Sequence, residues 1–523
     1  MDIAFPRFKI FVLVLLSASL VSYLFTFFYQ FQNNPWTQFT LLNLILLFYL
    51  AYEALGLYKK DSFRPILHPY FLTIVAFYLG MHLVPNIRLI FGDPTEYLDI
   101  HFIFWDDNPY KALNKAMILT IFSAFALFLG YKIKISESIG IQLHTRVKKF
   151  LTFSNKKEVT EKKSNLFIIF ILILMGLASL LTQIQLGVWG YGISEEVFEK
   201  YSAYAQWFSY VDRAQLLCVM ILAYSTHSIK KSSSKTTKTL FYLLLAFLSF
   251  QGFLFGSKGN VIYPIIVAGV AAYLATGRII YKYIYLTLVL LAIAFVTIEP
   301  YRIVKAIYPD ATFTESLALL SSVPDLIQEE TVEEDVTLLE RAEDLSFWFF
   351  GRLDQFSFGA NAIEYKDRYG IPFRTEAFNN PDFLGSIIYS PVLAFVPRLI
   401  WKDKPRDQIG TWYNDFITNT TYYSATDFGA VAYAYYAGGW VAIFLVFSFF
   451  GMMQRIIFES FFKLKNIQGV LTYFALVLPI VFIESAVGGV ITGFFRAIPM
   501  VLIIIFLIFL DYESLFKRVK HNQ

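Results

Sequence analysis

The stretch 166-LFIIFILILMGLASLLTQIQL-186 contains no charged side chain from Leu166 to Leu186. As a helix it is long enough to cross the hydrocarbon core of a bilayer, which takes about 20 apolar residues. Similar stretches recur along most of the chain, and hydrophobic residues make up 57% of the 523 positions. A soluble fold of this length rarely reaches that apolar fraction. The sequence therefore predicts an all-α, polytopic membrane protein.

The same length rule, applied from one end to the other, predicts about 12 transmembrane helices. The predicted spans are Phe8–Phe28, Phe39–Tyr58, Ile66–Val84, Leu113–Tyr131, Leu166–Leu186, Arg213–Ser228, Thr239–Phe255, Val261–Thr276, Tyr283–Ile298, Gly429–Phe450, Val470–Val487 and Val490–Leu510. They divide the chain into three parts. Residues 1–298 form a bundle of nine spans, residues 299–428 form one large loop, and residues 429–523 hold three more spans and a basic tail.

Basic residues predict which side each turn faces, because Lys and Arg are enriched on the cytoplasmic side of membrane proteins. Lys and Arg gather in alternate turns, most densely in Lys132–Lys163, and again in the tail from Lys517 to Lys520. We therefore expect both termini in the cytoplasm and the loop Glu299–Phe428 outside. The Lys132–Lys163 segment itself is expected to be a partly ordered linker near anionic headgroups.

Two apolar segments lie inside the large loop. Leu345–Ile363 mixes aromatic and charged residues and is typical of an amphipathic helix lying on the membrane. Phe383–Trp401 is apolar but is interrupted by Pro391 and Pro397. A crossing there would turn the basic C-terminal tail outward, so we expect a re-entrant or interfacial element.

Several familiar kinds of chemistry have no signature in the sequence. There is no glycine-rich phosphate loop, no paired-histidine zinc helix and no G-x-S-x-G elbow. A single cysteine, Cys218, excludes an internal disulfide. The net charge of +4 does not indicate a nucleic-acid partner. We expect no metal and no cofactor.

Cations at the expected outer membrane depth are the main chemical candidates. Lys258 lies in the tight turn Gly256-Ser257-Lys258-Gly259-Asn260, where glycines let backbone N–H groups approach an anion. The candidates for binding a diphosphate are Lys258, Arg302, Arg352, Arg398 and Lys404. Guanidinium forks bind phosphate oxygens bidentately. The alternative is anchoring to lipid headgroups, or a snorkelling lysine in a hairpin.

Three further residues are predicted to line or support such a site: Trp401, Glu484 and Arg496. Glu484 and Arg496 fall in the last two predicted spans, where a buried charge needs a partner. Their pairing could be purely structural.

Three local motifs carry a resemblance to the Wzy-type oligosaccharide repeat-unit polymerases, the O-antigen polymerase group. Gly256-Ser257-Lys258-Gly259 is similar to that family's Gly-Ser-Arg-Gly turn, with Lys in place of Arg. The string from Pro397 to Pro405 resembles Pro-Arg-x-x-Trp-Pro-Asp-Lys-Pro, with Lys402 replacing the inner proline. Tyr435-Tyr436-Ala437-Gly438-Gly439-Trp440 resembles the start of the family's span after the large loop.

The resemblance implies a helical bundle related to lipid-carrier glycosyltransferases of the C superfamily. It also implies a function: joining undecaprenyl-diphosphate-linked oligosaccharides into a surface polysaccharide at the outer face of the bacterial cytoplasmic membrane. A chain-length regulator is a possible partner. One base must deprotonate the acceptor hydroxyl, and Asp354 is the first candidate, with Glu299 second. Two alternatives stay open: a transferase similar to O-antigen ligases, and a polysaccharide exporter or flippase.

Overall fold

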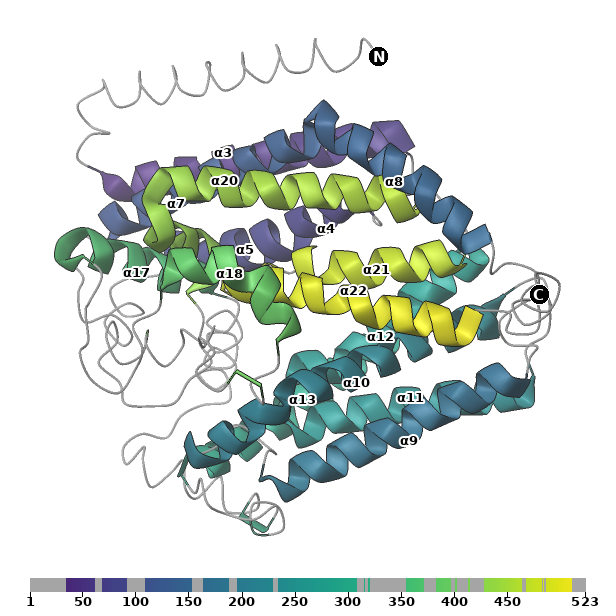
Figure 1. Cartoon of the computed structure of the whole chain (residues 1–523). Helices are drawn as coiled ribbons and strands as arrows, with labels where there is room; N and C mark the ends of the chain where they lie inside the picture. The colour runs from purple at the N-terminus through teal and green to yellow at the C-terminus, as the bar shows by residue number, and fades with distance from the viewer. Residues whose placement is uncertain are drawn as a thin grey trace.

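The computed structural model describes helices and a few adjoining residues over much of the chain (Figure 1). The described ranges are 34–61, 68–91, 109–152, 163–187, 195–228, 234–307, 354–370, 382–396, 428–462, 467–481 and 486–509, with a few single positions between them. All regular structure within these ranges is helical. The all-α, polytopic class predicted from the sequence is confirmed at this level.

Among the described residues, eight helical segments are long and apolar enough to cross a membrane. They are α3 (Pro35–Asp61), the run α4–η2–α5 (Pro69–Thr73, Ile74–Leu83 and Val84–Phe91), α7 (Tyr110–Lys132), α9 (Lys163–Gln185), α11 (Lys235–Leu254), α12 (Lys258–Thr276), α20 (Gly429–Phe461) and α22 (Val487–Phe509). Each overlaps a predicted span, and the count of twelve spans stays a prediction.

The other four predicted spans remain predictions. Phe8–Phe28 lies outside the described residues. Arg213–Ser228 forms the second half of α10 (Glu195–His227). The predicted spans Tyr283–Ile298 and Val470–Val487 overlap α13 (Tyr281–Ile307) and α21 (Ile467–Val481). The apolar parts of these two helices are shorter than the eight segments above.

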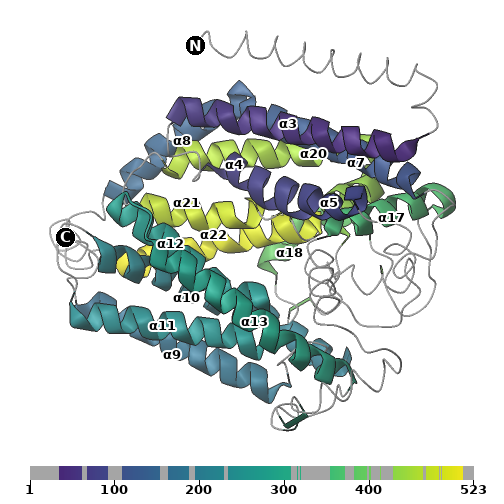
Figure 2. The ribbon, with the colours of Figure 1, turned by 180° about the vertical axis from the view of Figure 1, so that it is seen from behind.

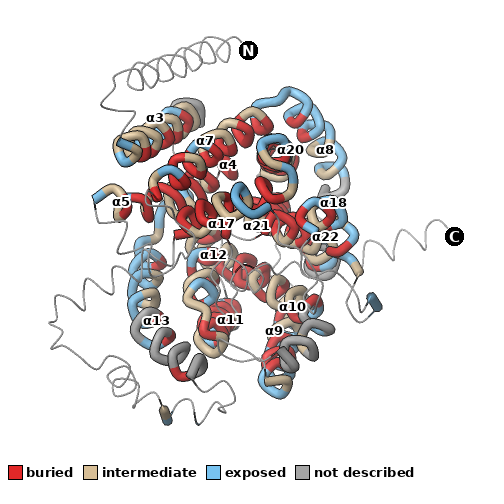
Figure 3. The backbone as a smooth tube through the Cα atoms, turned by 90° about the vertical axis from the view of Figure 1, so that its left-hand side faces the viewer, coloured by how far each residue is buried: buried red, intermediate tan, exposed pale blue. Residues whose placement is uncertain are grey.

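The helices form two groups joined through a central pair (Figures 1 and 2). One group contains α3, α4, α5, α7 and α20, and the other contains α9 to α13. Between them, α21 and α22 pack against both α20 and α10. Buried residues lie on the inner faces of the helices, while many outward faces are exposed (Figure 3). In a membrane protein these exposed apolar faces are where lipid would contact the bundle.

The closest helix packing joins α7 to α20. A Cβ on Gly451 would collide with the backbone of Leu127, and one on Gly130 would collide with Ser448. Small residues let two helix backbones approach closely, as is usual between membrane helices. Ser448 also donates to the carbonyl oxygen of Ala126 at 3.2 Å. These contacts fix the position of α20 in the bundle. They therefore also fix the positions of the side chains at its two ends.

The two ends of α20 contact different parts of the chain. Near its start lies α17 (Gln355–Tyr369), and near its end lies α8 (Lys134–Thr152). The expectation of a partly ordered linker in Lys132–Lys163 was therefore wrong over Lys134–Thr152, which is one continuous helix. A regular pattern of side chains facing α20 stabilises it.

Of the two helices described in the large loop, α17 differs from the expectation and α18 is compatible with it. α17 begins at Gln355, and its apolar side chains Phe356 and Ile363 are buried against the bundle instead of facing a membrane surface. α18 (Phe383–Phe395) is too short to span and contains Pro391. It packs along the first half of α22. Its length fits the expected re-entrant or interfacial element.

Candidate functional site

A row of polar side chains follows one face of α10. Gln206, Tyr210 and Arg213 are spaced at i, i+4 and i+7, which places them on the same side of a helix. The amide of Gln206 donates to the hydroxyl of Tyr210 at 2.9 Å and to the carbonyl oxygen of Ala394 at 2.9 Å. Arg213 donates from Nη1 to the carbonyl oxygen of Gly493 at 2.5 Å. The row therefore connects α10 with both α18 and α22.

A second arginine lies near Arg213, the last residue of this row. Arg213 on α10 lies within electrostatic range of Arg496 on α22, and both side chains are half-buried. Tyr210, Tyr263 and Asp212 also act on the Arg213 charge. Asp212 accepts a hydrogen bond from the amide of Gln251 on α11 at 3.2 Å. Two guanidinium charges within electrostatic range of each other inside an apolar bundle favour an anion nearby.

The C-terminal end of α18 lies beside the arginine-bearing helices. The Phe395 ring lies 6.3 Å from the Phe495 ring, next in sequence to Arg496, and Ala394 accepts the hydrogen bond from Gln206. One turn earlier, the hydroxyl of Thr492 donates to the carbonyl oxygen of Ser390 at 3.4 Å. The chain continues from Val396 directly into the motif Pro397–Pro405. Val396, the last described residue before that motif, follows directly on the end of α18 that contacts α10 and α22.

Lys258 is the first residue of α12, after a turn that requires glycine. Gly256 has φ of +62°, which side chains with a Cβ rarely adopt. Ser257 caps the helix, its hydroxyl accepting from the N–H of Asn260 at 3.3 Å. α12 packs directly on α10. The half-buried Lys258 thus adds its charge to the positive end of a helix dipole, a favourable combination for an anion.

Asp354, the first candidate for the base, has a structural role at the start of α17. It is the N-cap of α17, accepting from the backbone N–H of Ser357 at 2.7 Å. It also accepts from Arg88 on α5 at 3.1 Å, and its side chain is fully buried. Burial, a cap and an ion pair all favour a carboxylate that holds α17 in place.

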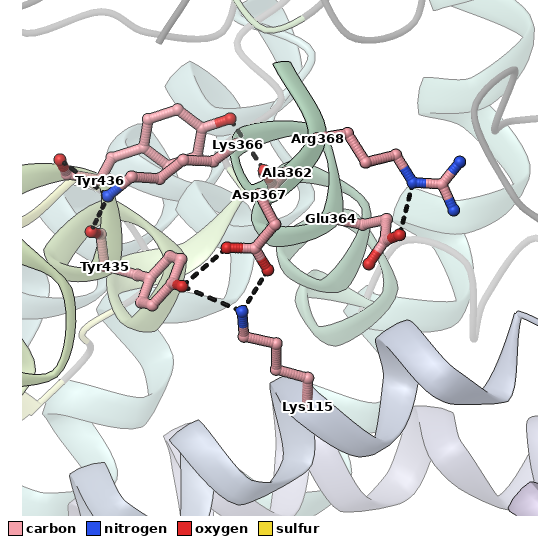
Figure 4. A network of polar contacts seen from close by, with 8 residues as sticks. All are labelled: Lys115, Ala362, Glu364, Lys366, Asp367, Arg368, Tyr435 and Tyr436. Atoms are coloured by element: carbon pink, nitrogen blue, oxygen red, sulfur yellow. Dashed lines mark hydrogen bonds and ion pairs between the residues drawn. The ribbon is translucent and has the colours of Figure 1, made fainter. Parts of the chain in front are cut away.

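A second polar network lies at the start of α20 (Figure 4). Lys115 on α7 forms an ion pair with Asp367 on α17. Tyr435 on α20 accepts from Lys115 at 3.0 Å and donates to Asp367 at 2.8 Å. Each of the three groups contacts the other two, so the network clamps α7, α17 and α20 together.

Lys366 completes this network by capping a broken helix. α20 leaves helical geometry at Gly438 and Gly439, so the carbonyl groups just before the break lose their partners in the next turn. The ammonium of Lys366 donates to the carbonyl oxygens of Tyr435 at 2.5 Å and Tyr436 at 3.3 Å. Burial lowers the pKa of Lys366 from its ordinary value. The Tyr-Tyr-Ala-Gly-Gly motif of the sequence is thus a kink with a lysine cap.

The predicted site residues fall into three groups. The described side chains are Lys258, Asp354, Trp401 and Arg496, of which Trp401 is exposed and suits an interfacial anchor. Glu299 and Arg302 lie within α13, but their side chains are outside what the structure describes. Arg352, Arg398, Lys404 and Glu484 also lie outside the described residues. The predicted cluster as a whole therefore remains a prediction.

Sequence reasoning missed Arg213 as a site residue because it was taken as the edge of a span. The signal was present in the polar spacing Gln206, Tyr210, Arg213 inside an otherwise apolar helix. It missed Arg88, Lys115, Lys366 and Asp367 for a different reason. Each of these four residues forms a contact between helices that are far apart in sequence.

Fold and site together define the class: a polytopic helical membrane protein with charged side chains inside its bundle. No family model matches the chain, and neither a curated protein nor a solved structure matches it. Within the part of the chain that the structure describes, no group of three or more His, Cys, Asp or Glu side chains is placed to hold a metal ion.

Proposed function

We propose that this protein is a glycosyltransferase that joins undecaprenyl-diphosphate-linked oligosaccharide repeat units into a surface polysaccharide. The observation that carries the proposal is the meeting of Arg213 and Arg496 beside the end of α18. Like charges close together inside a membrane bundle are unusual and often mark pathways or ligand sites. A lipid diphosphate is an anion that can reach such a place from within the bilayer.

The reaction needs little beyond positioning and charge stabilisation. The bond between the donor sugar's anomeric carbon and its diphosphate breaks, and the diphosphate leaves with the electron pair. The acceptor hydroxyl forms the new glycosidic bond and gives its proton to a base. Arg213 and Arg496 would stabilise the charge that develops on the diphosphate, with Lys258 and Arg398 as further candidates.

The base in this proposal is Glu299 in preference to Asp354. Asp354 is fully buried, caps α17 and pairs with Arg88, so each of its oxygens already accepts a hydrogen bond and water has little access. Glu299 lies on α13, at the end of a predicted span that leads into the large loop. A carboxylate there would be closer to water, which keeps it ionised and able to accept the proton.

The sequence resemblance and the arrangement of the helices both support this proposal. The motifs similar to the Wzy-type polymerases are the Lys258 turn at the start of α12, the Pro397–Pro405 string that follows α18 in the sequence, and the Tyr-Tyr-Ala-Gly-Gly-Trp segment that contains the kink within α20. The loop helix α17 and the basic helix α8 contact opposite ends of α20. That separation is what an outward loop and a cytoplasmic basic helix require.

Purified protein in liposomes tests the proposal with an undecaprenyl-diphosphate-linked oligosaccharide as the sole glycan. We expect a ladder of longer lipid-linked glycans without any added nucleotide sugar. Transfer only after addition of a different acceptor would support the ligase-like alternative. Movement of unaltered substrate across the bilayer would support an exporter.

A further inference from the structure

Helix α8 leaves the end of a membrane span without any intervening loop. α7 ends at Lys132, Ile133 takes an extended conformation, and α8 begins at Lys134. It then runs obliquely across the end of the bundle opposite α17 (Figures 1 and 2). Because α7 is apolar up to its last turn, α8 starts where the hydrocarbon core of a bilayer would end.

α8 is fixed in orientation by contacts with the end of α20. A Cβ on Gly140 would come within 2.6 Å of the Glu459 Cβ, so only glycine permits this approach. Ser460 donates to the carbonyl oxygen of Gly140 at 3.2 Å. Arg455 bridges the two helices, 3.1 Å from Glu137 and 2.8 Å from Glu459. The side of α8 that faces the bundle is therefore settled.

One exposed flank of α8 carries Ile135 and Ile139, with Arg146 between them around the helix, and the rest of the exposed surface is mainly polar and basic apart from Ile141, which is 50% exposed. Ile135 is 63% exposed and Ile139 is 37% exposed, and their spacing of four places them on one flank. Thr145 lies about 120° away from Ile139 around the helix axis. The exposed basic side chains of α8 are Lys134, Arg146, Lys148 and Lys149.

We infer that α8 is an interfacial helix that binds an anionic phospholipid surface. The isoleucine flank would lie at the boundary of the acyl chains, and the lysines and the arginine would contact the headgroups. Apolar burial together with basic charge is the combination that holds amphipathic helices at such a surface. The inference rests on the helices and charges of α8, and it holds or fails independently of the proposed enzymatic function.

Depth-dependent fluorescence quenching tests the position of the flank. Single cysteines replace Ile139 or Thr145 in a Cys218→Ala background, carry an environment-sensitive fluorophore, and are compared in nanodiscs containing brominated phospholipid. We expect strong quenching at position 139 and weak quenching at position 145. Equal, weak quenching at both positions would overturn the inference and leave the flank as a surface for a protein.

Thermal stability in two lipids tests the charge. The full protein is placed in nanodiscs of phosphatidylcholine alone or of phosphatidylcholine with phosphatidylglycerol. We expect a midpoint several degrees higher in the anionic discs, and we expect the difference to disappear when Lys134, Arg146, Lys148 and Lys149 are all changed to Gln. The control is Lys111→Gln, an exposed lysine at the first turn of α7, which should keep the difference. The same midpoint in both lipids, or an unchanged difference in the quadruple variant, would contradict anionic lipid binding.

Discussion

Arg88 on α5 and Asp354 at the start of α17 form an ion pair across 266 residues of sequence, with Nη2 3.1 Å from Oδ2. Asp354 is fully buried and Arg88 is 15% exposed. The pair ties the large loop to the N-terminal half of the bundle. Breaking a buried pair leaves a charge without its partner, which costs far more than losing a surface pair.

Asp354→Asn is expected to destabilise the protein by about 3 kcal/mol, the lower end of the range for a buried pair, because Arg88 keeps some exposure. Asparagine preserves the cap, so the loss reports the ion pair. Denaturation in detergent measures it. The matched control is Asp382→Asn, since Asp382 caps α18 in the same way but is exposed. Normal stability with lost activity would instead make Asp354 the base.

The kink in α20 predicts a glycine requirement. Gly439 has φ of +63° and ψ of −145°, a conformation that is essentially confined to glycine. Gly439→Ala should cost on the order of 1–3 kcal/mol in unfolding free energy. Gly259→Ala is the control, because it lies in a helix with nothing within 4 Å of the added Cβ. Equal stability of the two variants would show that α20 is continuous through this point.

The Lys115–Asp367–Tyr435 network predicts a coupling between α7 and α17. A double-mutant cycle with Lys115→Met and Asp367→Asn should give a coupling free energy of about 0.5–1 kcal/mol. The value is small because both side chains are about one-third exposed and screened by water. Raising the salt concentration should weaken it. The pair Glu364–Arg368, which lies within α17 alone, serves as a control for local effects. A coupling near zero would mean that the network does not hold the helices together.

Sidedness can be measured at two exposed, described positions. Thr145 lies on α8 and Tyr369 on α17, at the two ends of α20. Cysteines at these positions, in a Cys218→Ala background, should react with a membrane-impermeant reagent from opposite sides, with position 369 reactive in intact cells. Reaction of both from one side would contradict the predicted topology.

Much of the fold could be predicted because span length and apolar content follow directly from bilayer thickness. Leu166–Leu186 is the plainest example, since α9 covers nearly the same residues. The bounds of α10 were harder to predict, since the predicted span begins at Arg213 whereas the helix begins at Glu195. The charged residues in its middle interrupt the apolar pattern because they face other helices.

The site was less predictable because it depends on contacts between distant segments. Lys258 and Arg496 were identified from charge at membrane depth, which is a local signal. The Arg88 partner of Asp354 and the proximity of Arg213 to Arg496 are set by how helices pack, and a single sequence carries no record of that packing. For the same reason Lys366 could not be recognised as the cap of a kink in α20.

The central claim is that Arg213 and Arg496 bind the diphosphate of a lipid-linked substrate, and a rate measurement tests it most directly. Polymerisation of an undecaprenyl-diphosphate-linked oligosaccharide is followed in liposomes for wild type, Arg213→Lys, Arg496→Lys and the exposed control Arg278→Lys. A lysine keeps the charge but not the bidentate fork. We predict that each of the first two variants slows the reaction by about a hundredfold while folding normally, and that the control matches wild type. Wild-type rates in Arg213→Lys and Arg496→Lys, or no polymer from the wild-type protein, would contradict the account.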